Sequence, residues 1–145
     1  NIRRLLGGWK LPFLDDGPFD ADPAQSAQWN RGAYLVNAAA HCAECHSPRN
    51  SLGAVVPAQR FAGGPNPEGE GWVPNITQAA LKDWSVDDFV QLLEFGDTPT
   101  GRPISGSMIP VIRNTSQLPP EDRMAMAVYL KSLPAIEGPR RPEKK

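Results

Sequence analysis

The sequence predicts a mainly α domain in which three or more helices are joined by long loops. Three segments carry the start and stop residues that are typical of helices. The chain has 145 residues, which is the size of one domain. Its 16 Pro and 13 Gly residues make up a fifth of the length, so much of the chain is expected to be loop.

The first predicted helix follows Asp22, which is placed as the N-cap with Pro23 at the first helical position. Apolar and aromatic residues continue the pattern to Val36. The helix is expected to end near Ala39 or Ala40, directly before a pair of cysteines.

The second predicted helix follows Ser85, because residues 85–88 resemble a capping box with Asp in place of Glu. Its apolar face comes from Phe89, Leu93 and their neighbours, and Gly96 supplies the stop.

The third predicted helix opens at Pro119 and Pro120, followed by two acidic residues near the positive end of the helix dipole. Apolar residues from Met124 to Leu133 form its buried side, and Pro134 ends it.

Both cysteines of the protein lie in the run Cys42-Ala43-Glu44-Cys45-His46. This run matches the c-type haem attachment pattern C-x-x-C-H. Two thiols on one helical turn can form thioethers with the two vinyl groups of a haem, and the next imidazole can reach the iron. The sequence therefore predicts one covalently attached haem c with His46 as the proximal ligand.

Three other interpretations of this run are less favoured. A redox dithiol usually accompanies a βαβ pattern, and the flanking segments lack the β-branched runs of such a fold. Zinc binding would need His41 and His46 to converge with the two thiolates on one tetrahedral ion, which adjacent Cys-His pairs disfavour. A disulfide across two residues would close a very small loop and stabilise little.

The haem also explains how so loop-rich a chain can fold. Long loops without secondary structure are unusual in a compact domain, whereas a large apolar cofactor gives them a surface to pack against. We therefore expect helices and long loops wrapped around one haem, and we expect the haem-free chain to lack fixed tertiary structure.

The candidates for the distal iron ligand are Met108, Met124, Met126 and His41. Met124 and Met126 lie in the third predicted helix, where Met usually fills the core. Met108 lies in an irregular segment rich in Gly and Pro, which can hold a thioether over the iron, and it is the preferred candidate. Met/His ligation leaves no open coordination position and favours electron transfer over catalysis.

The charge and hydropathy of the chain narrow its function class. A net charge of −1 argues against nucleic acid as a partner. No apolar run approaches membrane-spanning length, and the chain begins without a signal-peptide pattern. Because this kind of haem attachment requires export in bacteria, we expect a periplasmic protein from which a leader or anchor has been removed.

With these residues the chain resembles the class I cytochromes c. In that fold an N-terminal helix with a Gly and an aromatic residue crosses a C-terminal helix with an aromatic residue near its end. Gly32, Tyr34 and Tyr129 occupy these positions here, and the resemblance runs from about residue 22 to residue 136. It implies a close helix crossing that an aromatic side chain fills.

A narrower resemblance is to the cytochrome subunits of bacterial membrane-associated alcohol, aldehyde and gluconate dehydrogenases. Those subunits often carry three haem domains, whereas this chain has one motif. The matching strings are RGAYLV at 31–36, HCAECHSPRN at 41–50, AGG at 62–64, PNIT at 74–77 and WS at 84–85.

The resemblance also implies further haem contacts. It places Trp72 and Asn75 in a loop around the haem, and it places Arg49 among the arginines that can pair with the propionates. In class I cytochromes a proline carbonyl accepts the proton of the proximal imidazole, and Pro48 and Pro57 are the candidates for it here.

Together these expectations divide the chain into an N-terminal extension (1–21), a cytochrome c domain (22–136) and a basic C-terminal tail (137–145). The expected role is that of a periplasmic one-electron carrier, not an enzyme, with no catalytic residue. It would accept electrons from a dehydrogenase and pass them to a cytochrome or oxidase of the respiratory chain, with membrane association through the removed N-terminal segment. The alternative is a haem domain for catalysis or ligand sensing, with an open sixth position.

Overall fold

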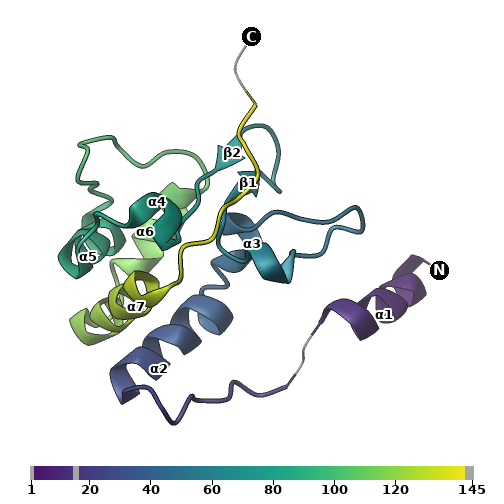
Figure 1. The fold of residues 1–145 in the computed structure, drawn as a ribbon, viewed down its shortest axis with the longest axis horizontal. Helices are drawn as coiled ribbons and strands as arrows, with labels where there is room; N and C mark the ends of the chain where they lie inside the picture. The colour runs from purple at the N-terminus through teal and green to yellow at the C-terminus, as the bar shows by residue number, and fades with distance from the viewer. Residues whose placement is uncertain (1, 15–16, 143–145) are drawn as a thin grey trace.

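The computed structural model describes residues 2–14 and 17–142 and shows a mainly helical fold (Figure 1). The helices are α1 (Ile2–Phe13), α2 (Ala27–Tyr34), α3 (Ala43–His46), α4 (Gln78–Leu81), α5 (Val86–Phe95), α6 (Met108–Thr115) and α7 (Pro120–Ser132). A π-helical turn (Leu35–Ala39) extends α2, a 3-10 turn covers Pro57–Gln59, and Gly64–Pro65 (β1) pairs antiparallel with Trp72–Val73 (β2). The predicted mainly α class is confirmed.

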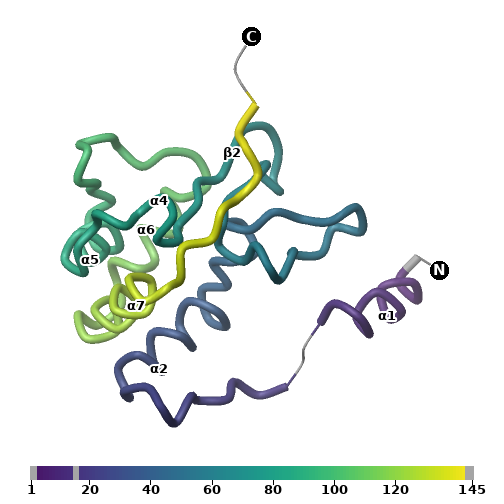
Figure 2. The backbone as a smooth tube through the Cα atoms, viewed as in Figure 1, coloured from purple at the N-terminus to yellow at the C-terminus, as the bar shows by residue number. Residues whose placement is uncertain are grey.

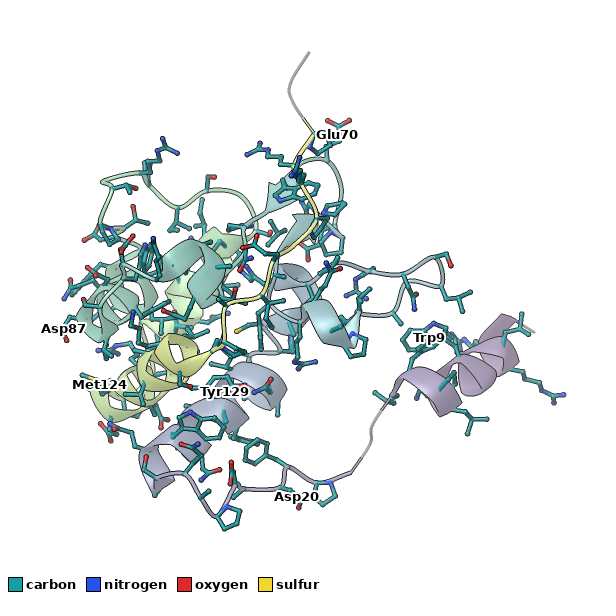
Figure 3. The ribbon with its side chains drawn as sticks, viewed as in Figure 1. Trp9, Asp20, Glu70, Asp87, Met124 and Tyr129 are labelled. Carbon is teal, nitrogen blue, oxygen red and sulfur yellow. The ribbon has the colours of Figure 1, made fainter. Side chains whose placement is uncertain are left out.

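Helices α2 and α7 cross in direct backbone contact. A Cβ atom added at Gly32 would lie 1.9 Å from the carbonyl oxygen of Ala125 and 3.0 Å from Cβ of Tyr129. The ring of Tyr129 lies at the crossing (Figure 3), edge-on to Trp29 at 5.0 Å. Tyr34 does not fill the crossing; it is 39% exposed and packs against Phe19.

The core lies where α2, its π-helical extension, α5 and α7 meet. The largest side chains with less than 2% exposure include Phe89 and Met126, from α5 and α7. The segment between α3 and α4 adds Phe61. The rest of the cluster is Leu35, Val36, Ala43, Leu93, Ala127, Leu130 and Leu133.

The limits of α5 and α7 follow the sequence signals. Ser85 caps α5 in a full capping box with Asp88, and Gly96 ends it with a φ of 79°. Helix α7 begins at Pro120 and ends before Leu133, as predicted.

The predicted start of the first helix was wrong by about four residues. Ser26, not Asp22, caps α2 by accepting a hydrogen bond from Trp29 N. Asp22 instead caps the preceding turn, where its Oδ1 accepts from Ala24 N at 2.9 Å. Asn30 holds that turn against the helix by donating to the Asp22 carbonyl. The predicted end near Ala40 is confirmed, because Ala40 closes the π-helical turn.

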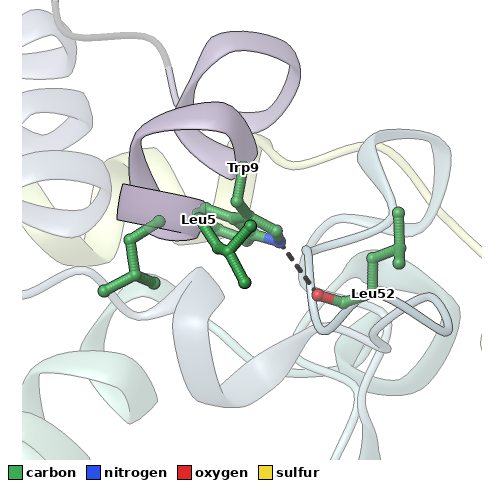
Figure 4. A pocket seen from close by; sticks show the side chains of 4 residues that line it. Leu5, Trp9 and Leu52 are labelled. Carbon is green, nitrogen blue, oxygen red and sulfur yellow. Dashed lines mark hydrogen bonds between the residues drawn. The ribbon is translucent and has the colours of Figure 1, made fainter. Parts of the chain in front are cut away.

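Helix α1 lies apart from the helical core, beside the loop that follows α3 (Figures 1 and 2). Trp9 Nε1 donates to the Leu52 carbonyl at 2.9 Å. An open apolar hollow of about 400 Å³ lies between them and is lined by Leu5, Leu6, Trp9 and Leu52 (Figure 4). Within the described ranges, no helix has the length and apolarity needed to cross a bilayer.

Candidate functional site

The short helix α3 carries the two cysteines and the following histidine on one turn. Cys42 is its N-cap residue and His46 its last residue, and His46 N donates to the Cys42 carbonyl at 2.9 Å. Cys42 N in turn donates to Val36 O at 3.0 Å, which joins α3 to the π-helical turn. Both cysteines are free thiols. The three residues predicted to hold the cofactor are therefore brought together by local helical geometry.

The imidazole of His46 is buried and held at one nitrogen. Its Nδ1 lies 2.9 Å from the carbonyl oxygen of Pro74, and the side chain is 9% exposed. Since a carbonyl can only accept, Nδ1 carries the proton, and in the neutral imidazole Nε2 then keeps its lone pair. Burial lowers the pKa of His46, while the bond to Pro74 acts in the opposite direction. A neutral imidazole with a fixed tautomer is the form that binds a metal ion.

The two prolines predicted for this bond were the wrong ones. Pro74 accepts from His46, whereas Pro48 and Pro57 do not. Pro48 uses its carbonyl to accept from Val56 N at 3.0 Å, and the carbonyl of Pro57 accepts from Arg60 N in a tight turn. Pro74 is adjacent to β2, so the β1–β2 pair brings it back to α3 from 28 residues further along the chain.

The electrostatics of the thiols disfavour the redox-dithiol alternative. Burial raises the pKa of the Cys42 thiol to about 11. Burial, followed by the nearby Glu68 carboxylate, also raises the pKa of Cys45. Reactive dithiols depend on a lowered thiol pKa. The zinc alternative lacks support as well: residues 2–14 and 17–142 contain no group of three or more His, Cys, Asp or Glu side chains that could hold a metal ion. His41 is exposed.

Arg49 ties the loop after α3 back to the helix. Its Nη2 donates to the carbonyl and the carboxylate of Glu44, at 2.7 and 2.8 Å, and its Nη1 donates to Gly53 O at 2.6 Å. The guanidinium is thus engaged in shaping the 49–53 loop. Its predicted pairing with a propionate stays a prediction.

Trp72 lies two residues before Pro74, and Asn75 follows it directly. Trp72 is half-buried in β2, paired with Pro65. Asn75 donates from Nδ2 to the Ile136 carbonyl at 2.8 Å, and its Oδ1 accepts from Thr77. Asn75 therefore links the Pro74 segment to the chain that follows α7.

The three methionines differ in their surroundings. Met126 is 1% exposed in the core, and Met124 is half-buried on α7. Met108 is half-buried but does not lie in an irregular loop; it is the first residue of α6, which packs on α5. The helix is compatible with Pro110 because that residue lies in the first turn, where its missing N–H would be unpaired anyway.

Two residues that sequence reasoning missed are Pro74, through its carbonyl, and Thr77. Thr77 is fully buried and caps α4 through its side chain. A Thr directly before a short helical stretch is an N-cap signal, so Thr77 was detectable. The role of Pro74 was not, because it depends on a contact between segments 28 residues apart.

The sequence of the chain is similar to those of known proteins. The family model described as Cytochrome c matches residues 30–134. The chain is 52% identical over 140 residues to a "Diheme cytochrome c-type" protein of Cereibacter sphaeroides, covering 94% of this chain and 46% of that protein.

Two further relatives are parts of dehydrogenases. The chain is 40% identical over 134 residues to a nicotinate dehydrogenase subunit of Pseudomonas putida, covering 92% of this chain and 11% of that protein. It is also 40% identical over 140 residues to the "Fructose dehydrogenase cytochrome subunit" of Gluconobacter japonicus, covering 93% and 28%. The chain thus spans less than half the length of each of these relatives.

Proposed function

The chain belongs to the cytochrome c family, and from this membership we propose that it carries single electrons for a bacterial dehydrogenase. The relatives named as dehydrogenase subunits support a redox partner of that type. In this role the chain binds no substrate and performs no bond-making chemistry. Its residues hold the cofactor, exclude water from it and fix the ligands of its iron.

A cytochrome c domain binds haem c covalently, and the iron of that group supplies a one-electron couple. The donor set of α3 fits it. Cys42 and Cys45 are free thiols one turn apart, and they would form the two thioethers. His46 would bind the iron through Nε2. The observation that carries the proposal is the bond from His46 Nδ1 to the Pro74 carbonyl, because it fixes the tautomer that leaves Nε2 available.

Met108 is proposed as the distal ligand. Met126 is buried in the core, whereas Met108 is the first residue of α6 and directly follows the irregular segment 96–107. A thioether ligand together with the His46 imidazole would raise the reduction potential and leave no open coordination position. Trp72 would pack near the haem edge, and Arg49 is the proposed donor to a propionate.

We place this carrier in the bacterial periplasm, since haem attachment of this type follows export. It has one attachment motif and is proposed to bind one haem. The electron donor would be a dehydrogenase, and the acceptor a cytochrome or oxidase of the respiratory chain.

Haem attachment is tested with the pyridine haemochrome spectrum and a haem stain after denaturing electrophoresis. We expect one covalent haem per chain in the wild type. The double variant Cys42→Ala/Cys45→Ala is expected to lose it, while the matched control Glu44→Gln, inside the same motif, keeps it. A wild-type chain without covalent haem, produced in a host that attaches haem to other cytochromes, would refute the proposal.

The distal ligand is tested by the weak thioether-to-iron absorption band at the red end of the oxidised spectrum. Met108→Ala is expected to abolish the band, and Met124→Leu to retain it. High-spin iron that binds carbon monoxide readily in the wild type would instead support the catalytic or sensing alternative. Stopped-flow reduction of the oxidised protein by a dehydrogenase then tests the carrier role.

A further inference from the structure

The Pro74 carbonyl that orients His46 belongs to a segment without regular secondary structure. The Pro74 ring is exposed and adds little packing. Because a hydrogen bond weakens quickly with misalignment, other contacts must fix the Pro74–Asn75 peptide. Two sets of contacts do so.

The first set comes from residues 61–63. Gly63 N donates to the His46 carbonyl at 2.7 Å, and Ile76 N donates to the Phe61 carbonyl at 2.9 Å. A Cβ atom at Gly63 would lie 2.6 Å from Asn75 N and 2.8 Å from the carbonyl carbon of Pro74. The backbone of Gly63 therefore rests directly on the peptide that accepts from His46.

The second set is a partly buried polar cluster made by Asn75, Thr77 and Ile136. Thr77 is 0% exposed. Its N and Oγ1 both donate to Asn75 Oδ1, at 2.8 and 2.7 Å, and its Oγ1 accepts from Ile136 N at 3.2 Å. Asn75 Nδ2 donates to the Ile136 carbonyl at 2.8 Å.

The segment after α7, residues 134–138, contacts residues of both sets, and we call it the C-terminal strap. It runs alongside β2 (Figure 2). Gln59 Nε2 donates to the Glu137 carbonyl at 3.3 Å. Gly138 touches the Ala62 carbonyl so closely that a Cβ atom there would lie 1.9 Å from its oxygen.

We infer that Asn75 and Thr77, locked by the C-terminal strap, are positioning residues that hold the Pro74 carbonyl on His46 Nδ1 and so set the donor strength of the proximal imidazole. This inference rests on the proposed haem ligation by His46. A firm bond at Nδ1 makes the imidazole more basic and favours oxidised iron. Loosening the cluster is therefore expected to raise the reduction potential.

The test compares Thr77→Val with Thr77→Ser in the haem-loaded protein. Val keeps the shape but removes the hydroxyl, and Ser keeps the hydroxyl. For Thr77→Val we expect the equilibrium constant for reduction to rise about threefold, or about 28 mV for one electron. The His46 Nδ1 proton, followed by NMR in the reduced protein, should exchange with solvent about tenfold faster, as a weakened bond predicts. Thr77→Ser should match the wild type in both.

The strap is tested independently with Gly138→Ala, which must displace it from Ala62. The matched control is Gly8→Ala, since a Cβ atom at Gly8 meets nothing within 4 Å. We expect Gly138→Ala to shift the potential and the proton exchange in the same direction as Thr77→Val, and Gly8→Ala to shift neither.

Two results separate the possible failures. If Thr77→Val and Gly138→Ala lower the stability of the protein but leave the potential and the Nδ1 proton unchanged, the cluster is only structural and the inference is overturned. If the wild type carries no covalent haem by the haemochrome assay, the proposed function fails before any variant is compared.

Discussion

Gly32 of α2 lies so close to Ala125 of α7 that a Cβ atom at position 32 would come within 1.9 Å of the Ala125 carbonyl oxygen. Any side chain at this position would have to push the two backbones apart. The same helices are joined by a bidentate ion pair between Arg31 and Asp122, with donor–acceptor distances of 2.8 and 2.7 Å. The crossing therefore depends on the absence of a side chain at position 32 and on the ion pair of the neighbouring Arg31 with Asp122.

Replacing Gly32 by Ala is expected to lower the free energy of unfolding by about 2 kcal/mol, as overpacking a tight interface does. Urea denaturation of the haem-loaded protein, followed by circular dichroism, measures it. Gly8→Ala is the control, because position 8 is open and Ala favours a helix. A Gly32→Ala protein as stable as the wild type would contradict the close crossing.

The elements that could be predicted from sequence are those whose signals act within one or two turns. Ser85 and Asp88 form a capping box in the sequence and in the structure, and Gly96 ends the same helix. The attachment run is equally local, since Cys42, Cys45 and His46 need only one helical turn to come together.

The features that could not be predicted depend on a choice between two nearby caps or on contacts between distant segments. Ser26 and Asp22 are both good N-cap residues, and in the structure Ser26 accepts from Trp29 N at the start of α2 while Asp22 caps the preceding turn. The carbonyl of Pro74 reaches His46 because Gly63 has no side chain. No local pattern around residue 74 contains that information.

Acid is expected to weaken the α2–α7 crossing through Asp122. The hydrogen bonds from Arg31 hold the pKa of this carboxyl below its usual 3.8. A depressed carboxyl pKa stabilises the fold at pH values above the unfolded pKa, and this contribution is lost as the pH falls through the folded pKa. The Asp122→Asn variant should therefore be less stable than the wild type at neutral pH, and the difference should shrink as the pH falls below 3.8.

Urea midpoints of both proteins, measured between about pH 7 and about pH 3, test this expectation. Taking the difference between wild type and variant cancels the titration of all other groups. A difference that stays constant over this range would show that the ion pair contributes nothing that depends on pH.

Arg123 is expected to be the most costly charged side chain to remove. It is 5% exposed and joins three helices: its Nη2 lies 3.0 Å from Glu94 Oε1 on α5, and its Nη1 donates to the Ser116 and Leu118 carbonyls after α6. Arg123→Ala would leave the partly buried carboxylate of Glu94 and these carbonyls without their donor. We expect a loss of about 3 kcal/mol.

The matched control is Arg113→Ala on the exposed side of α6, with an expected change within about 0.5 kcal/mol. Both values come from urea denaturation of the haem-loaded protein. If the two substitutions lower the free energy of unfolding equally, the buried contacts of Arg123 do not contribute more to stability than an exposed arginine does.

Removal of the haem is expected to abolish fixed tertiary structure while leaving much of the helix content. The segment 97–107 explains why. Its side chains are mostly exposed, and Thr98, which donates to Arg102 O, provides only local bonds. Such a loop needs a partner surface to stay ordered. The Cys42→Ala/Cys45→Ala protein, freed of haem, should keep its far-ultraviolet circular dichroism but lose the near-ultraviolet signal and cooperative unfolding. A haem-free chain that unfolds as cooperatively as the haem-loaded form would show that α2, α5 and α7 suffice to order the loops.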